Sequence, residues 1–86
     1  MFNIVDRYMK NLSINDVDTF AKKKSVNLSN EELEFTYTFI KKNYKEILQN
    51  PKLFNIDRYK SKYSPENFDK VKKVFTEYFS KYQRFL

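Results

Sequence analysis

The chain has 86 residues and a formal net charge of +6, and it contains no glycine, cysteine, histidine or tryptophan. Without histidine or cysteine it lacks the usual ligands of zinc, haem and iron–sulfur clusters, as well as a thiol nucleophile and an imidazole base. Without glycine it lacks the glycine-rich loops that hold phosphate groups. We therefore expect a protein that is not an enzyme and that carries no cofactor or metal.

Apolar residues make up 41% of the chain and aromatic residues 19%. Each buried aromatic ring removes about 150–250 Å² from water, so a chain of this length can form the core of one small domain. No uninterrupted apolar run is longer than two residues, and the N-terminus lacks the pattern of an export signal. We expect a single domain over residues 1–86, in the cytoplasm and not associated with a membrane.

The first helix is predicted from a stripe of apolar residues at helical spacing: Ile4, Val5, Tyr8, Met9 and Leu12. It should end near Asn11, because asparagine tolerates the left-handed conformation that closes many helices. Ser13 and Asp16 then have the spacing of a capping box, which predicts the start of a second helix. That helix ends at three consecutive lysines, residues 22–24, whose charges interact favourably with its negative end.

The third helix has the clearest start signal, because Ser29 precedes Glu32 at capping-box spacing and acidic residues fill the first turn. Its apolar residues keep helical spacing as far as Asn50. Pro51 predicts a break and the start of a short fourth helix, since proline favours the first helical position. The apolar residues of this fourth helix are Leu53, Phe54, Ile56, Tyr59 and Tyr63.

Ser64, Pro65 and Glu66 predict the start of the last helix. Its apolar residues alternate steps of three and four: Phe68, Val71, Phe75, Tyr78, Tyr82 and Phe85. This regular series could form the seam of a homodimer. It covers fewer than three heptads and a wide face, however, which favours a helix of a monomeric core.

The positive charge allows two interpretations. Lysine outnumbers arginine 14 to 3 and alanine occurs once, which is the composition that an AT-rich coding sequence produces without selection for binding. The excess nevertheless lies in residues 44–86, which carry a net charge of +5 against +1 for residues 1–43. Five lysines of this half are candidates for nonspecific contacts with nucleic acid: Lys60, Lys62, Lys70, Lys72 and Lys73. Tyr59 and Tyr63 lie beside two of them and could stack on bases, but their spacing fits a core stripe better.

The order of these segments resembles the YqfT-like proteins, a small uncharacterised family of Gram-positive bacteria. The matching stretches cover nearly the whole chain: residues 12–17 with Phe20 and Ala21, residues 26–29, Asn50 with Pro51, and residues 64–66 leading to Val74, Phe75, Tyr78 and Phe79. The chain departs from the family pattern in having Pro51 at the break and no glycine before Pro65. The resemblance implies a bacterial helical protein, and it implies no activity or site.

Together these patterns predict an all-α, compact single-domain bundle of four or five short helices. The expected core residues are Phe20, Leu33, Tyr37, Ile40, Phe68, Val71, Phe75 and Phe79. For function, the first hypothesis is a non-enzymatic module that binds a protein partner through an exposed aromatic or basic face. The alternatives are a nonspecific nucleic-acid-binding protein that uses the five lysines, and a homodimer formed through the last helix.

Overall fold

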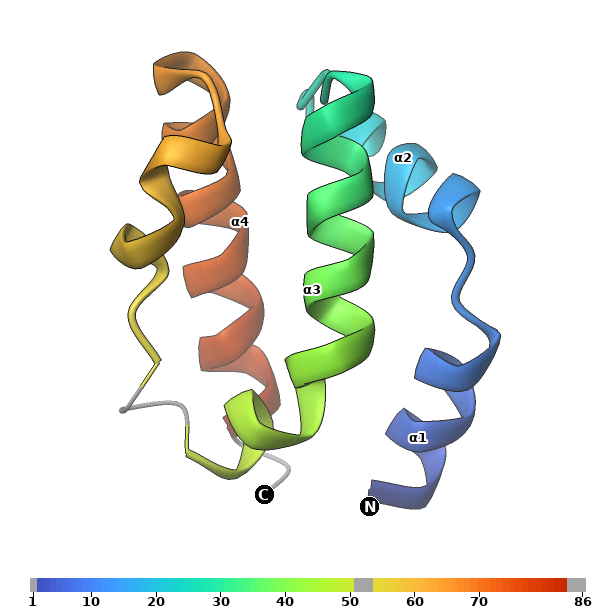
Figure 1. Cartoon of the computed structure of the whole chain (residues 1–86). Coiled ribbons are helices and arrows are strands. Elements are labelled where there is room, and N and C mark those ends of the chain that lie inside the picture. Colours follow the sequence, from blue (N-terminus) through green and yellow to red (C-terminus); the bar gives the residue numbers. More distant parts are fainter. Residues whose placement is uncertain (1, 51–53, 84–86) are drawn as a thin grey trace.

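The chain folds as an all-α bundle built around one long central helix (Figure 1). The computed structural model describes residues 2–50 and 54–83. In chain order, its elements are α1 (Phe2–Asn11), α2 (Ile14–Lys23), α3 (Asn30–Gln49), the 3₁₀ helix η2 (Ile56–Lys62) and α4 (Pro65–Gln83). α1 and α2 lie on one side of α3, and η2 and α4 lie on the other. The radius of gyration is 12.5 Å, close to the value of about 12 Å expected for a compact chain of this length. The predicted compact all-α bundle is confirmed.

The predicted helix starts are confirmed at their caps. The hydroxyl of Ser13 accepts the backbone N–H of Asp16, and the carboxylate of Asp16 accepts the backbone N–H of Ser13. Ser29 and Glu32 form the same reciprocal pair at the start of α3. Each box satisfies two backbone groups that the helix itself leaves without a partner. The predicted ends near Asn11 and Asn50 are also confirmed.

The predicted short fourth helix is found, but its described turns begin at Ile56, and the predicted start at Pro51 lies outside the described residues. Residues 51–53 lie outside the described part of the chain, and residues 54–55 are not helical. The side chain of Asn55 accepts the backbone N–H of Asp57 at 3.0 Å and caps the 3₁₀ helix that begins at Ile56. The local cap of an asparagine, rather than the fixed φ of the proline, decides where this helix begins.

The buried apolar side chains of the described residues come from α2, α3, α4 and the connections that flank α2: Leu12, Val17, Ala21, Val26, Ile47 and Phe68. Of the eight expected core residues, Phe68 is buried and five are half-buried: Leu33, Tyr37, Ile40, Val71 and Phe75. Phe20 lies at the edge and is 37% exposed, so its assignment to the core is wrong. The side chain of Phe79 lies outside the described part.

Aromatic rings fill the space between α3, η2 and α4. Phe39 of α3 packs against Tyr59 of η2 with ring centroids 4.7 Å apart, and Phe54 packs against Phe75 of α4 at 4.8 Å. Phe35 lies 5.8 Å from Tyr59. Tyr63 joins the same cluster through Phe35 and Phe68. Both tyrosines that could have stacked on bases are thus half-buried in the interior.

A serine occupies the left-handed position after α2, where glycine is the usual residue. The backbone N–H of Val26 donates to the carbonyl of Ala21 at 2.8 Å, and that of Ser25 donates to the carbonyl of Lys22 at 3.0 Å. These two bonds form a Schellman motif, which requires a left-handed residue after the cap. That residue is Ser25, with φ of 63°.

One carboxylate, that of Glu32, caps two helices. Its Oε1 accepts the backbone N–H of Ser29 at 2.8 Å, which completes the capping box of α3. Its Oε2 accepts the backbone N–H of Ser64 at 2.7 Å. The hydroxyl of Ser64 caps α4 by accepting the N–H of Asn67, at the position where a capping box carries a glutamate or glutamine. Glu32 therefore supplies, from α3, the acceptor that α4 lacks.

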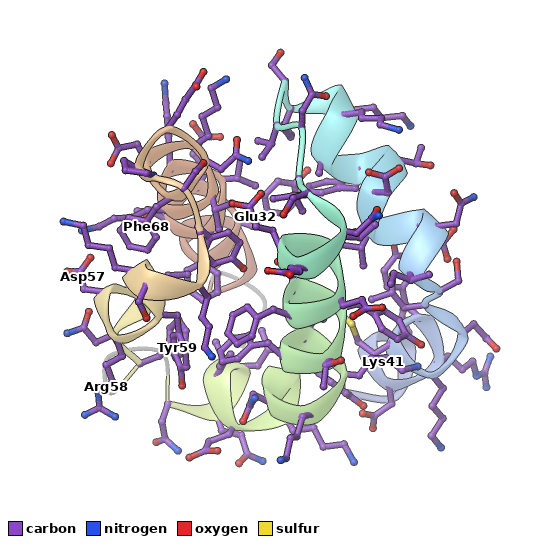
Figure 2. All side chains as sticks on the ribbon, turned by 45° about the horizontal axis from the view of Figure 1, so that its top comes forward. Glu32, Lys41, Asp57, Arg58, Tyr59 and Phe68 are labelled. Carbon is purple, nitrogen blue, oxygen red and sulfur yellow. The ribbon has the colours of Figure 1, made fainter. Side chains whose placement is uncertain are left out.

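Glu32 is charged and only 6% exposed, yet no cation pairs with it in the described part of the chain. Figure 2 shows its carboxylate between α3 and α4. The amide of Asn67 donates a third hydrogen bond to Oε1 at 2.8 Å. Burial by itself would raise the pKa of Glu32, but the hydrogen bonds from the backbone of Ser29 and Ser64 and from Asn67 outweigh it. The pKa therefore lies below its ordinary value of 4.5.

We expect Ser25→Gly to stabilise the protein by up to about 1 kcal/mol, because glycine adopts positive φ without a clash of its Cβ. Urea denaturation measures the change. Ser25→Ala is the matched control, since it also removes the hydroxyl but keeps the Cβ, and it should give no stabilisation. Equal effects of the two variants would contradict this explanation.

We expect Glu32→Gln to destabilise the protein at pH 7 by about 2–3 kcal/mol. The amide oxygen of glutamine can accept the backbone N–H of one serine, but its NH₂ group faces the backbone N–H of the other and cannot accept it. Glu31→Gln, in the same turn but exposed, should cost less than about 0.5 kcal/mol. Urea denaturation of the three proteins tests both values. A cost for Glu32→Gln as small as that of the control would show that the shared cap contributes little.

The effect of Glu32 should depend on pH. Because its folded-state pKa is lowered, its stabilisation is present above its ordinary pKa of 4.5 and is lost as the pH falls through the folded pKa. The difference in unfolding free energy between the native protein and Glu32→Gln should therefore shrink between about pH 5 and about pH 3. A difference that stays constant over this interval would contradict the lowered pKa.

Candidate functional site

The structure separates the lysines that the sequence suggests for nucleic-acid contact. Lys60 and Lys62 lie on η2, and Lys70, Lys72 and Lys73 lie on α4. The ammonium of Lys72 contacts Asp57 of η2 at 2.8 Å. The ammonium of Lys70 instead donates to the carbonyl of Ser25, beyond α2, at 3.2 Å. These two lysines therefore point to opposite sides of α4.

The three remaining lysines of the five also lie in different surroundings. The ammonium of Lys62 lies 5.7 Å from the ring centroid of Phe35, a cation–π contact with the aromatic cluster. The side chains of Lys60 and Lys73 are exposed and make no ion pair or hydrogen bond with a described residue. The five charges thus do not converge on one point.

Acidic side chains alternate with the lysines of α4. Glu66, Asp69 and Glu77 are all exposed on this helix, and Glu66 lies 3.6 Å from the ammonium of Lys70. A surface that follows a phosphate backbone is a groove or stripe of one sign of charge. The mixed signs on α4 do not build such a stripe.

The most exposed large apolar side chains of the described chain lie instead on α1. Ile4 is 78% exposed and Tyr8 is 64% exposed. They are four residues apart and therefore lie next to each other on the same side of the helix. Arg7 is exposed between them and makes no ion pair with a described residue. We call these three residues, Ile4, Arg7 and Tyr8, the α1 ridge.

The α1 ridge is exposed because polar contacts hold another side of α1 against α3. The hydroxyl of Tyr44 donates to the carboxylate of Asp6, which also lies 3.8 Å from the ammonium of Lys45. This hydrogen bond raises the pKa of Tyr44, since ionisation would remove its proton. Ile4 precedes Asp6 by two residues, so its side chain points about 200° around the helix from it. Turning Asp6 to α3 turns Ile4 to solvent.

A second polar contact fixes the end of α1. The ammonium of Lys41 on α3 donates to the backbone carbonyls of Met9 at 2.7 Å and Lys10 at 3.0 Å. Figure 2 shows Lys41 pointing from α3 toward α1. The carbonyls in the last turn of a helix lack partners within the helix, and a cation there also interacts favourably with the helix dipole.

Other exposed apolar side chains are more covered than the α1 ridge. Ile14 is 39% exposed. Phe20 packs edge-on against Tyr78 of α4 with ring centroids 5.1 Å apart, and the ammonium of Lys24 lies over the same tyrosine. The α1 ridge therefore contains the most exposed large apolar side chains of the described chain, and we take it as the candidate site.

Sequence reasoning missed this ridge because it assigned the whole apolar stripe of the first helix to one side. The apolar residues of the predicted first helix, together with Leu12 just beyond it, cover a wide arc of the helix surface. One neighbouring helix cannot bury all of this arc. Leu12 is buried and Met9 half-buried, while Ile4 and Tyr8 are left outside. The width of the arc was the available signal.

Side chains that could bind a metal ion do not gather among the described residues. No group of three histidine, cysteine, aspartate or glutamate side chains among them could hold a metal ion. Glu32, their one buried carboxylate, has its oxygens occupied by N–H donors. Across residues 2–50 and 54–83, no helix has the combination of length and apolarity that crossing a bilayer requires.

Comparison of the chain with protein-family models, with curated proteins and with solved structures gives no match in any of the three. The resemblance to the YqfT-like proteins therefore stays a prediction.

Proposed function

We propose that this chain is a non-enzymatic protein-binding module and that the α1 ridge is its contact surface. The observation that carries the proposal is the exposure of Ile4 and Tyr8, 78% and 64%, side by side on one helix. Together they present on the order of 300 Å² of side chain to solvent, which is the size of patch that is often functional on small proteins. Tyrosine and arginine are also the residues that most often dominate binding energy at protein interfaces.

The size of the α1 ridge favours a concave partner over a second copy of the chain. Two ridges packed face to face would bury about 300 Å² on each side, whereas a stable interface buries about 800 Å² on each side. A groove that encloses α1 would also cover its flanks, as grooves that bind amphipathic helices do. Arg7, which pairs with no acidic side chain of the described residues, favours a partner with a carboxylate at the edge of that groove.

The other hypotheses have less support from the contacts. The described apolar side chains of α4 are buried or half-buried within the bundle, so little of the described part of that helix is left to form the seam of a homodimer. Three of the five candidate lysines, Lys62, Lys70 and Lys72, contact different parts of the structure, and acidic residues flank the lysines of α4. These contacts favour a protein partner over nucleic acid.

Site-specific photo-crosslinking in the cell that produces the protein tests the proposal. With benzoylphenylalanine in place of Tyr8, we expect a discrete crosslinked protein. The same amino acid in place of Arg58, exposed on the far side of the bundle (Figure 2), is the matched control and should not give this adduct. Identical adducts from the two positions, or none from position 8, would overturn the proposal.

Binding to the crosslinked partner should depend on the α1 ridge. We expect Ile4→Glu to weaken it at least about tenfold, the effect of losing a central apolar contact. Thr38→Glu places the same charge on the exposed side of α3 and should change the affinity by less than about twofold. Titration calorimetry with the purified partner measures both, and equal losses would show that net charge rather than the α1 ridge matters.

A further inference from the structure

None of the side chains that the structure describes in α1 is buried. Asp6 and Met9 are half-buried, and the other described side chains of the helix are exposed. In contrast, α2, α3 and α4 each contribute at least one buried side chain. Burial of apolar surface is the main force that holds a helix to a bundle, and the described side chains of α1 contribute less of it than those of the neighbouring helices.

The described contacts that fasten α1 are polar and come from one stripe of α3. Tyr44 and Lys45 follow Lys41 by three and four residues, and the three side chains reach Asp6 and the carbonyls of residues 9 and 10. We call this set of contacts the α1 clasp. Lys45 is 62% exposed and lies 3.8 Å from Asp6, so its attraction is weakened by water and salt.

The start of α2 does not depend on α1. Only residues 12 and 13 separate the two helices. Ser13 and Asp16 cap α2 with each other's groups, without a contribution from α1. The buried side chain of Leu12 anchors the chain just before this cap. Loss of α1 would therefore leave the remaining helices with their caps and their core.

From these contacts we propose that α1 opens as a separate unit, leaving α3 while α2, α3, η2 and α4 stay folded. A helix of ten residues is too short to persist alone in water, so α1 melts when it leaves. Its role in binding rests on the function proposed above: the closed helix offers only the α1 ridge, whereas the open segment also frees Met9. A partner groove would then refold the segment around a wider apolar face.

Hydrogen exchange of the full chain, followed by NMR without any partner, measures the opening. In the native protein, the amides of residues 6–11 should exchange at least about 100-fold faster than those of residues 38–47 in the middle of α3. Equal rates in the two segments would mean that α1 opens only when the whole protein unfolds, and would overturn the proposal.

Two variants test the α1 clasp from its two sides. Asp6→Asn removes the ion pair with Lys45, and Lys41→Met removes the donor to the α1 carbonyls while keeping an apolar side chain. Each should speed exchange in residues 6–11 by about three- to tenfold and leave residues 38–47 unchanged. Asp18→Asn is the matched control, because Asp18 is 22% exposed against 25% for Asp6 and also pairs with a lysine. It should change exchange in residues 6–11 by less than about twofold.

The outcomes separate this inference from the proposed function. If Asp6→Asn and Lys41→Met accelerate both segments equally, or no more than Asp18→Asn accelerates residues 6–11, the α1 clasp does not control a separate opening and the inference is wrong. That result would leave the crosslinking experiment unaffected. Conversely, separate opening without any crosslinked partner would refute the proposed function alone.

Discussion

The arrangement of the bundle depends on the carboxylate of Glu32. It lies near the N-termini of α3 and α4, where unpaired N–H groups and the positive ends of two helix dipoles replace the cation that a buried charge usually requires. Removing it would leave the backbone N–H of Ser64 without its acceptor. Because the same carboxylate caps both helices, it fixes the start of α4 against the start of α3, and the aromatic cluster then packs in the space between them.

The two sides of α3 hold their neighbouring helices by different kinds of contact. On the side of η2 and α4, the long helix is covered by aromatic rings and joined through Glu32. On the side of α1, the described contacts are the polar ones of the α1 clasp, and the most exposed large apolar residues of the described chain lie on that helix. The free energy of unfolding of a small domain is low. A helix held mainly by polar contacts, such as α1, therefore needs the least free energy to leave the bundle and bind a partner.

The net charge of the chain has a less direct meaning than its value suggests. A total of +6 would favour binding to a polyanion, but three lysines of the second half contact Asp57, the Ser25 carbonyl and the ring of Phe35. Their placement fits a role in holding loops and η2 to the helices. The α1 ridge has a single charged residue, Arg7, so recognition there would rest on shape and apolar contact more than on long-range attraction.

By itself, the sequence determined the all-α class, the caps at Ser13 and Ser29 and the ends at Asn11 and Asn50, because these depend on residues three or four positions apart. The start of η2 at Ile56 was missed although its cap, Asn55, is also local, since the proline upstream gave a competing signal. Only the tertiary structure decided which part of a wide apolar arc is buried. The exposure of Ile4 and Tyr8 follows from the contact of Asp6 with Tyr44, 38 residues away. The second role of Glu32 follows from Ser64, 32 residues away. Neither the contact of Asp6 with Tyr44 nor that of Glu32 with Ser64 can be predicted from local spacing, because these residues come together only when the helices pack.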